Sequence, residues 1–305
     1  MLGQLTLSKA RGYMRWLLSH PDFRERPAQI LWRAIQWQIR SRLHREPVVR
    51  FDDAIEMRSP RRNVSASSTF YFGFSEPAFH KFLSAYLQPG MTVVDIGANV
   101  GAYTLLAAKR VGPGGRVVAF EAAPQIYRFL MENVDRNRFG NVVVENVAVG
   151  QAEGHLRFTV QAGDLGKSHV HSPLEDDGVE VIDISVIDLD GYCSRSGLRR
   201  IDYMKIDVEG YEMPVLRGAR RTLADNPTML VQMEAIDHHA KRFGSDLRSI
   251  MAFMGEIGFR PHEIDKSGSV LTRLEDLDGY WGDVIWIHDK ALDRLAGIAS
   301  VRSTV

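Results

Sequence analysis

The sequence has a single cysteine, Cys193, among its 305 residues, so no disulfide can form within the chain. This excludes the small secreted domains that depend on disulfides and favours a reducing compartment. No apolar stretch approaches the roughly 20 residues that a membrane-spanning helix requires. Lys9, Arg11 and Arg15 interrupt the N-terminal apolar residues, which is unlike a signal peptide. These absences predict a cytoplasmic protein.

An excess of charge of one sign is also lacking, because 38 Lys and Arg residues balance 38 Asp and Glu residues. A neutral chain gives no reason to expect a general binder of polyanions, so we expect no nucleic-acid partner. The charge is nevertheless uneven along the chain. Residues 1–50 carry ten basic residues against three acidic ones, a net charge of +7, which leaves −7 for the remainder.

Residues 28–43, inside this basic segment, have the pattern of an amphipathic helix. The apolar positions recur at four-residue intervals with two tryptophans beside them: Leu31, Ile35, Ile39 and Leu43, then Trp32 and Trp37. Two interpretations stay open. The helix packs on the rest of the protein or a second subunit, or it makes weak peripheral contact with an anionic membrane. A polar stretch follows at 58–68, so we predict a basic helical appendage over 1–60 and the main domain over 61–305.

Residues 91–104 organise the rest of the chain. Val93, Val94 and Ile96 are apolar and β-branched, as in a strand that is buried on both faces. A helical pattern begins after Gly101. Glycine at positions 97 and 101 lets the backbone turn tightly and lets a ligand approach closely. The stretch therefore predicts a strand, a glycine turn and a helix that together cradle a nucleotide.

The nicotinamide-binding fingerprint Gly-x-Gly-x-x-Gly is absent from this turn. The chain has Asp95-x-Gly97-x-x-x-Gly101 instead, with a carboxylate at the end of the strand. That carboxylate would repel a pyrophosphate, but it suits the cationic amino group of S-adenosylmethionine. Glu121 ends the next predicted strand, 116–121, where an acidic residue accepts hydrogen bonds from ribose hydroxyls. The two markers together predict S-adenosylmethionine as the cofactor.

Alternating strand and helix patterns continue downstream, which is typical of an α/β fold with a parallel sheet. The predicted strands are 141–149, 203–207, 229–234, 259–264 and 283–288, and the predicted helices are 78–87, 125–138, 211–223 and 249–258.

An inserted β-hairpin is predicted over 154–160 and 179–186, with a polar tip that reaches over the substrate. His169 and His171 in that tip alternate with Val170, so an extended chain would point both toward the same side, as metal ligands require. The absence of a third ligand nearby favours solvated loop histidines instead.

Four stretches resemble the successive motifs of the FkbM-type methyltransferases. They are Asp95 to Thr104, Phe120-Glu121, Asn146 to Val149, and Lys205 to Glu212. The resemblance covers roughly residues 70–289. It implies a class I, Rossmann-like α/β fold. Together with the patterns above, we expect a mixed, mostly parallel seven-stranded sheet with helices on both faces, the inserted hairpin and the N-terminal helical appendage. The resemblance also implies S-adenosylmethionine-dependent methyl transfer, usually to the hydroxyl of a sugar or another natural product.

The motifs also provide the candidate site residues. The expected cofactor contacts are Asp95, Gly97, Ala98, Asn99, Gly101, Tyr103, Glu121, Ala122, Asn146 and Ala148. The side chain and backbone at Asn146 are expected to read the adenine edge. Parallel α/β sheets place their sites at the carboxyl ends of the strands, which adds the catalytic candidates Lys205, Asp207, Glu209 and Glu234.

Two interpretations of the Lys205–Asp207 pair stay open. In one, Asp207 takes the acceptor's proton with Lys205 as its charge partner, while Glu209 binds acceptor hydroxyls. In the other, Lys205 and Asp207 form a buried pair that only holds the strand. Glu212, in the first turn of a helix, is expected to stabilise the helix start.

Oxygen is the favoured methyl acceptor, because the chain lacks the Asn- or Asp-Pro-Pro-aromatic tetrapeptide that binds an amine or amide nitrogen. Cys193 is badly placed to attack a pyrimidine ring. We therefore expect a small-molecule or glycan hydroxyl as the acceptor, with no metal. Two alternatives remain: a catalytically silent partner protein that binds the cofactor, and a metal-assisted enzyme in which Asp207 and Glu234 share a divalent ion with a catechol-like substrate.

Overall fold

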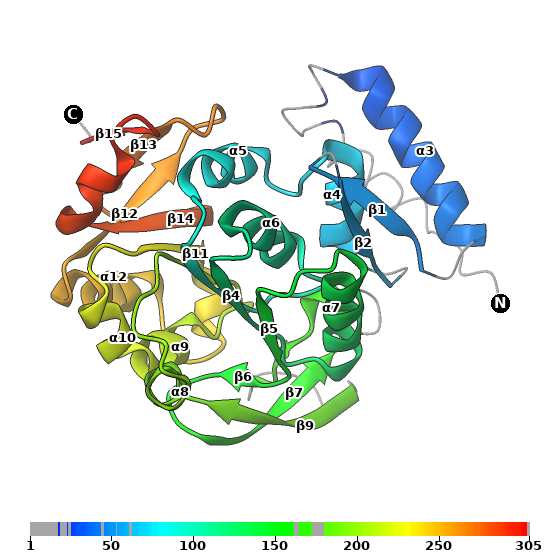
Figure 1. The fold of residues 1–305 in the computed structure, drawn as a ribbon. Coiled ribbons are helices and arrows are strands. Elements are labelled where there is room, and N and C mark those ends of the chain that lie inside the picture. The colour runs from blue at the N-terminus through cyan, green and yellow to red at the C-terminus, as the bar shows by residue number, and fades with distance from the viewer. Residues whose placement is uncertain are drawn as a thin grey trace.

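The computed structural model describes residues 18, 23, 26–43, 46–52, 54–60, 63–161, 165–172 and 180–303. A twisted sheet of nine strands runs through the centre of these residues, in the order β15-β13-β12-β14-β11-β10-β3-β4-β5 (Figure 1). In chain order, the first five strands of this sheet are β3 (Thr92–Ile96), β4 (Arg116–Phe120), β5 (Val142–Glu145), β10 (Tyr203–Ile206) and β11 (Leu230–Ile236). The other four are β12 (Phe259–Ile264), β13 (Val270–Arg273), β14 (Trp281–His288) and β15 (Ser300–Arg302).

Strands β5, β4, β3, β10 and β11 are parallel neighbours, and β14 continues the sheet antiparallel to β11. Alternate residues of these strands enter two separate hydrophobic cores, one on each face of the sheet. In β3, Val93 belongs to one core, whereas Val94 and Ile96 belong to the other. The near-continuous apolar runs of the sequence thus reflect strands that are covered on both faces.

Helices cover both faces. One core includes buried residues of α5 (Pro77–Tyr86), α6 (Ala102–Val111) and α7 (Pro124–Arg136). The other includes buried residues of α8 (Leu189–Ser196), α9 (Glu212–Gly218), α10 (Arg220–Asp225) and α12 (Leu247–Glu256). Cys193 lies buried in α8 as a free thiol. The helix predicted over 211–223 is in fact two, because α9 ends at Gly218, where a Cβ would lie 1.9 Å from the carbonyl oxygen of Gly150.

The strand order reverses between β3 and β10. From β3 the sheet grows outward through β4 and β5 on one side, and from β10 through β11 on the other. Asp95 in β3 lies directly opposite Lys205 in β10. The crevice at the carboxyl ends of strands flanking such a reversal is where open α/β sheets bind ligands.

The insertion after β5 is more than a hairpin. Strands β6 (Ala148–Val149), β7 (Gly154–Val160), β8 (His169–Val170) and β9 (Glu180–Ile187) form a separate four-stranded sheet in the order β6-β9-β7-β8. The single strand predicted over 141–149 was therefore wrong. It divides after Glu145, and β6 turns away to pair with β9.

The predicted count of seven strands in the central sheet was also wrong. The sequence predicted β3, β4, β5, β10, β11, β12 and β14, but it missed β13 and β15, which extend the edge beyond β12. These two strands have only four and three residues, and Leu271 is their one fully buried side chain. Such short, exposed strands carry almost no alternating apolar pattern.

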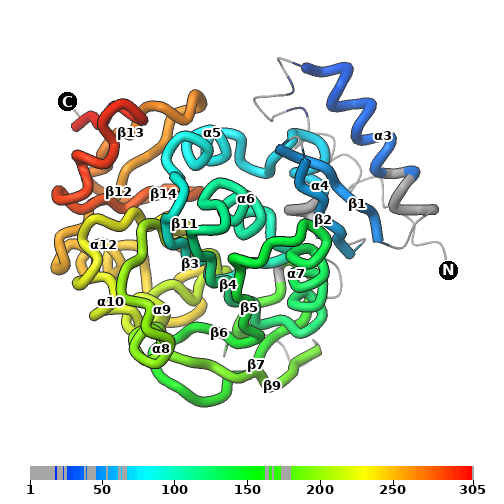
Figure 2. The backbone as a smooth tube through the Cα atoms, viewed as in Figure 1, coloured from blue at the N-terminus to red at the C-terminus, as the bar shows by residue number. Residues whose placement is uncertain are grey.

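In the described N-terminal residues, α3 (Pro27–Leu43) is followed by the hairpin of β1 (Val48–Phe51) and β2 (Ile55–Arg58), and then by α4 (Val64–Phe72). These elements lie side by side in Figure 2, next to α7. The side chains of Asn133 and Asn137 on α7 accept hydrogen bonds from backbone N–H groups of β2. The polar stretch 58–68, predicted as the boundary between the appendage and the main domain, thus includes the end of β2 and part of α4.

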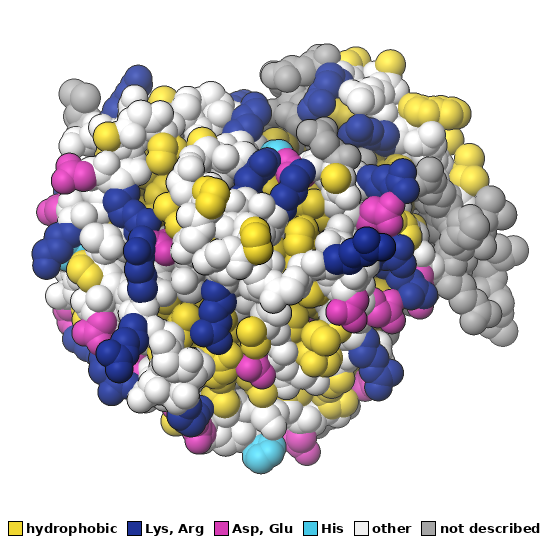
Figure 3. Space-filling view, in the orientation of Figure 1, with side chains coloured by type: hydrophobic (Ala, Val, Ile, Leu, Met, Phe, Trp, Pro, Cys, Tyr) yellow, Lys and Arg dark blue, Asp and Glu magenta, His cyan; other side chains and the backbone are white. Residues whose placement is uncertain are grey.

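Helix α3 packs on α4 through a different face from the predicted stripe. Ile30, Ala34 and Trp37 are buried, and the Trp37 ring lies 5.4 Å from that of Phe70. The exposed face carries Leu31, Trp32, Ile35 and Ile39. Hydrophobic side chains are visible on this outer part of the molecule in Figure 3. In the described part of the chain, no helix is long and apolar enough to cross a bilayer.

Candidate active site

The glycine turn after β3 touches the end of β10. Gly97 has φ +81°, and a Cβ there would lie 1.9 Å from the backbone carbonyl oxygen of Asp207. The N–H of Asp207 in turn donates to the carbonyl of Ile96. Only glycine fits such a contact, and this is why the sequence needs Gly97 beside the fourth parallel strand. Two adjoining cavities share this junction, with Gly97, Asn99, Asp207 and Glu209 in the walls of both.

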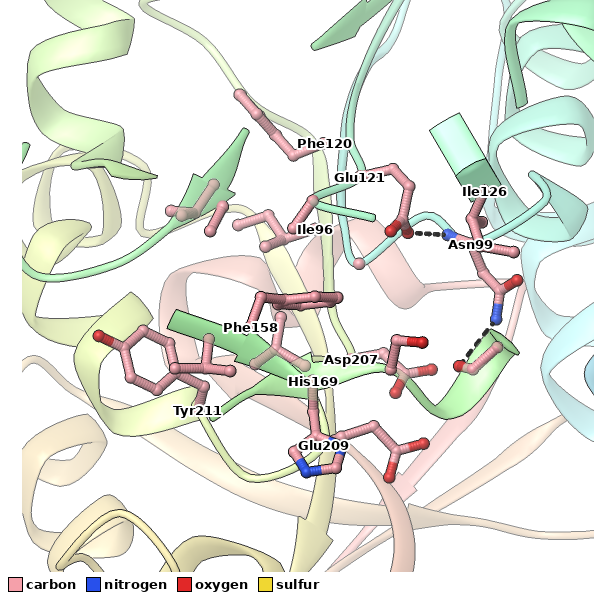
Figure 4. A pocket seen from close by; sticks show the side chains of 18 of the residues that line it. Ile96, Asn99, Phe120, Glu121, Ile126, Phe158, His169, Asp207, Glu209 and Tyr211 are labelled. Atoms are coloured by element: carbon pink, nitrogen blue, oxygen red, sulfur yellow. Dashed lines mark hydrogen bonds between the residues drawn. The ribbon is translucent and has the colours of Figure 1, made fainter. Parts of the chain in front are cut away.

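Glu121 forms the polar end of the first cavity (Figure 4). One carboxylate oxygen accepts the backbone N–H of Asn99 at 2.8 Å, and the other accepts that of Ala123 at 2.8 Å. Burial raises the pKa of Glu121 to about 7, and the two backbone donors oppose that rise. The loops after β3 and β4 are therefore tied together by one buried carboxyl group.

Asn99 holds a left-handed backbone conformation, with φ +52°. Its Oδ1 accepts from Asn63 Nδ2 at 2.8 Å, and its Nδ2 donates to the carbonyl of Gly166 at 3.2 Å. The inserted sheet therefore forms a wall of the Glu121 cavity, through residues of 165–170 and Phe158 of β7; His169 and Phe158 are labelled in Figure 4. The insertion was predicted to reach over the substrate. Its described residues lie at the cavity that holds Glu121.

The rest of this cavity is mainly apolar, with Phe120, Ala122, Ile126, Val147, Ala148 and Phe158 among its lining residues. Apolar side chains along the walls, with the Glu121 carboxyl group at one end, fit an adenosine group. Asn146 is not among the lining residues. Its Nδ2 donates to the backbone carbonyls of Glu121 and Ala122, so its side chain fixes the loop after β4.

Asp95 is 1% exposed at the end of β3. Its Oδ2 accepts from Thr104 Oγ1 at 2.6 Å, and its Oδ1 has no hydrogen-bond partner in the described residues. Burial raises the pKa of Asp95, and the Lys205 ammonium opposes that rise.

Gly101 ends the loop after β3 with φ +99°, and a Cβ there would lie 2.6 Å from Leu130 Cδ1. Ala98 in the same loop is buried, and its N–H donates a hydrogen bond to the carbonyl of Phe120.

The second cavity is strongly acidic. Among its described lining residues, six carboxyl groups surround a single lysine, Lys205: Glu76, Asp95, Asp207, Glu209, Glu234 and Asp283. Lys205 is 3% exposed, and its Nζ lies 2.6 Å from Asp207 Oδ2. Burial disfavours the charged form of Lys205, but Asp207 and the other carboxylates outweigh it and raise its pKa. The side chain of Asp207 is 39% exposed, so it is paired on one side and faces the cavity on the other.

A chain of hydrogen bonds backs this lysine. The hydroxyl of Tyr103 donates to Glu76, while Gln232 Nε2 donates to Tyr103 Oη at 3.1 Å and to Asp283 Oδ2 at 2.5 Å. The Tyr103 ring lies 4.6 Å from Lys205 Nζ. Burial and the nearby Asp283 raise the pKa of Glu76 to about 8. Glu76 thus faces this cavity and makes no side-chain cap on α5.

Glu209, Glu234 and His239 meet at the far side of the second cavity. His239 Nδ1 lies 3.0 Å from Glu234 Oε2 and 3.7 Å from Glu209 Oε2. Burial and the neighbouring acidic groups Asp207 and Glu209 raise the pKa of Glu234 to about 9. His239 belongs to the short helix α11 (Asp237–Lys241), which directly follows β11.

An aromatic pair stands beside this trio. The ring of His238 stacks on that of Trp281 with centroids 4.9 Å apart, and Trp281 is 70% exposed. A large exposed aromatic ring next to a polar cavity is a common ligand platform.

The structure brings together all four catalytic candidates, Lys205, Asp207, Glu209 and Glu234, and places them next to the glycine turn. Sequence reasoning missed Trp281 and Asp283, which are on the antiparallel strand β14. Pairing of β14 with β11 places Asp283 opposite Glu234. The sequence signal that could have identified Asp283 is its charge within an otherwise apolar strand pattern.

Glu212 was predicted to stabilise the start of a helix. Its buried carboxylate accepts the N–H of Gly210, just before α9.

His169 and His171 do not form a metal site with each other in the described residues. His171 Nδ1 shares a hydrogen bond with Thr159 Oγ1 at 2.9 Å. His169 is buried and lines the Glu121 cavity.

A doubly wound sheet with Gly97 at the strand reversal and an acidic residue after the next strand is a nucleoside-binding α/β arrangement, of the kind that class I, S-adenosylmethionine-dependent methyltransferases have. The chain belongs to the FkbM methyltransferase family, because the model of the methyltransferase FkbM domain matches residues 95–261, more than half of the chain. The matched segment is a methyltransferase domain, and S-adenosylmethionine is the cofactor of that domain.

Two curated relatives illustrate the family. The 31-O-demethyl-FK506 methyltransferase FkbM of Streptomyces tacrolimicus is 31% identical over 160 residues, which cover 43% of this chain and 60% of that protein. The hexuronic acid methyltransferase AglP of Haloferax volcanii is 24% identical over 141 residues, 46% of this chain and 55% of that protein. The chain thus spans less than two thirds of the length of these relatives.

The solved structures include the methyltransferase FkbM from Methylobacillus flagellatus. It has 17% sequence identity and a TM-score of 0.41, and the match covers 86% of this chain and 60% of that one.

Proposed function

We propose that this enzyme transfers the methyl group of S-adenosylmethionine to a hydroxyl oxygen of a sugar or another natural-product acceptor. The observation that carries the proposal is the pair of adjoining cavities that share Gly97, Asn99, Asp207 and Glu209. One cavity suits an adenosine group, and the other presents carboxylates that can accept hydrogen bonds from hydroxyl groups. The two relatives support the same direction, since one is named for an O-demethyl substrate and the other for a hexuronic acid.

In this proposal, Glu121 accepts hydrogen bonds from the ribose hydroxyls in the first cavity. Asp95 is a second residue that fits the cofactor. Its buried Oδ1 lacks a hydrogen-bond partner among the described residues, and Asp95 lines the second cavity. A cationic amino group would satisfy that oxygen. When bound, S-adenosylmethionine supplies an electrophilic methyl group and leaves as a neutral thioether.

The acceptor side is assigned to the second cavity. Asp207 takes the proton that the hydroxyl loses, since its side chain lies at the junction of the two cavities and Lys205 holds it in place. Glu209 and Glu234 bind acceptor hydroxyls, and the Trp281–His238 pair supports one face of the acceptor. Fixed orientation of the reacting oxygen can supply on the order of 7–11 kcal/mol, so Asp207 need not be a strong base.

Matched acceptors test this proposal. The purified protein is offered labelled S-adenosylmethionine with hydroxylated pyranosides and macrolides, and with the same compounds whose hydroxyls are already methylated. We expect label transfer only to the compounds with free hydroxyls. Equal transfer to the capped compounds, or transfer to amines alone, would refute an oxygen acceptor.

A further inference from the structure

The acceptor cavity contains one group of side chains with the geometry of a metal site. Glu209, Glu234 and His239 each offer one ligand atom, and these atoms all lie within 4.8 Å of one another. They come from three successive structural positions: the turn after β10, the end of β11 and the helix α11. The alternative that the sequence left open placed the ion between Asp207 and Glu234, but Asp207 is paired with Lys205.

The separations of His239 from the two glutamates fit a common ion. His239 Nδ1 lies 3.0 Å from Glu234 Oε2 and 3.7 Å from Glu209 Oε2. With metal–ligand distances of about 2.1 Å, these separations correspond to ligand–metal–ligand angles of roughly 90° and 125°. The first angle is that of octahedral coordination, and the second lies closest to the roughly 120° between equatorial ligands of a five-coordinate ion.

Backbone packing fixes the positions of Glu209 and His239 relative to each other. Glu209 has φ +53°, and Gly210, the next residue, has φ +108°. A Cβ on Gly210 would lie 2.4 Å from the carbonyl oxygen of His239. The turn that carries Glu209 therefore packs directly on the backbone of His239, and a site supported in this way is preorganised.

The charge around the trio calls for a cation. The side chains of Glu209, Glu234 and His239 are only 16–20% exposed, so water screens them poorly. Asp207 and Asp283 line the same cavity and add negative charge. Lys205 is the one lysine or arginine in the described lining of this cavity, and its ammonium is held by Asp207.

We propose that Glu209, Glu234 and His239 bind a divalent first-row transition-metal ion that takes the acceptor hydroxyl as a further ligand. Two carboxylate oxygens and one imidazole nitrogen suit Mn²⁺, Fe²⁺ or Zn²⁺, and they lack the thiolates that a copper(I) site prefers. Coordination lowers the pKa of the hydroxyl, whose proton then passes to the Asp207 carboxylate. Only this last role rests on the proposed function; the ion site itself does not.

Titration of the full chain with Mn²⁺ alone, followed by electron paramagnetic resonance of the free ion, tests the site without any acceptor. We expect a single bound Mn²⁺ in the wild type. Glu209→Gln and His239→Gln should each weaken its affinity at least about 10-fold, as even outer-shell changes at metal sites do. Glu275→Gln is the matched control, since it removes an equally charged carboxylate that is 66% exposed and lies outside this cavity.

The proposal is overturned if the folded wild type binds no Mn²⁺ at millimolar concentration, or if both variants bind it as tightly as the control. Near-ultraviolet circular dichroism shows whether each variant is folded, and either folded variant is sufficient for the comparison. Failure of the proposed function is a separate result: a protein that binds Mn²⁺ through this trio but methylates nitrogen would keep the ion site and lose the hydroxyl acceptor.

Discussion

Replacing Glu121 with glutamine should weaken cofactor binding and loosen the loops that form the cavity. The carboxylate accepts the N–H of Asn99 through Oε2 and the N–H of Ala123 through Oε1, each at 2.8 Å. A glutamine amide has only one acceptor oxygen, so its NH₂ group would face one of these donors. The substitution keeps the shape of the side chain and removes its charge and half of its acceptor capacity.

The substitution has separate effects on the free energy of folding and on the free energy of cofactor binding. A buried N–H without a partner costs about 1–3 kcal/mol of folding free energy, which should lower the melting temperature of the ligand-free protein. Losing the charged acceptor for the ribose hydroxyls costs about 1.5–3 kcal/mol of binding free energy, or roughly 10- to 150-fold in Kd.

Calorimetric titration with S-adenosylhomocysteine measures the affinity of Glu121→Gln. Glu145→Gln is the matched control, because Glu145 ends the neighbouring strand β5, accepts a hydrogen bond from Tyr192 and does not line the cavity. We expect the control to bind like the wild type. Equal affinity of a folded Glu121→Gln protein would refute the assignment of Glu121 to the ribose.

The same residue predicts two opposite pH dependences. Burial raises the pKa of Glu121 to about 7 from an ordinary 4.5, so the folded ligand-free protein holds this proton more tightly than the unfolded chain. The resulting stabilisation, roughly 3 kcal/mol, is complete below pH 4.5 and is lost as the pH rises through 7. Cofactor affinity should instead increase through pH 7, as the carboxylate ionises. Both dependences should flatten in Glu121→Gln.

Three further substitutions test other parts of the site. Asp207→Asn should lower turnover about 10²-fold or more with cofactor affinity and melting temperature near wild type; parallel losses of activity and stability would support a purely structural Lys205–Asp207 pair. Gly97→Ala should lower the melting temperature more than Gly90→Ala, because both glycines have positive φ but a Cβ on Gly90 meets nothing within 4 Å. Trp281→Ala should raise the KM for the acceptor and leave cofactor affinity unchanged; an unchanged KM would remove Trp281 from the acceptor site.

The parallel half of the fold could be predicted from the sequence because each strand carries its own signal. Val93, Val94 and Ile96 form an apolar run, and the glycines that follow satisfy a steric demand that the structure makes visible at Gly97. Asp207 and Glu209 follow a strand in the sequence, so their position at the sheet edge follows from topology alone.

The rest of the site depended on long-range pairing that no local pattern encodes. Asp283 enters the cavity because β14 runs antiparallel to β11 and sets Asp283 opposite Glu234. Glu76 directly precedes α5 in the sequence, yet its carboxyl group accepts a hydrogen bond from Tyr103. Asn146 looked like a ligand contact, but its amide is used by the carbonyls of Glu121 and Ala122. In each case the partner lies at least 24 residues away in the chain.

The position of the transferred methyl group tests the central claim most directly. The enzyme is supplied with S-adenosylmethionine carrying a trideuterated methyl group and with an acceptor that presents both hydroxyl and amino groups, such as an amino sugar. Mass spectrometry and NMR of the product then locate the label. We predict a trideuteromethyl ether on a hydroxyl oxygen; a label on nitrogen or carbon would contradict this account.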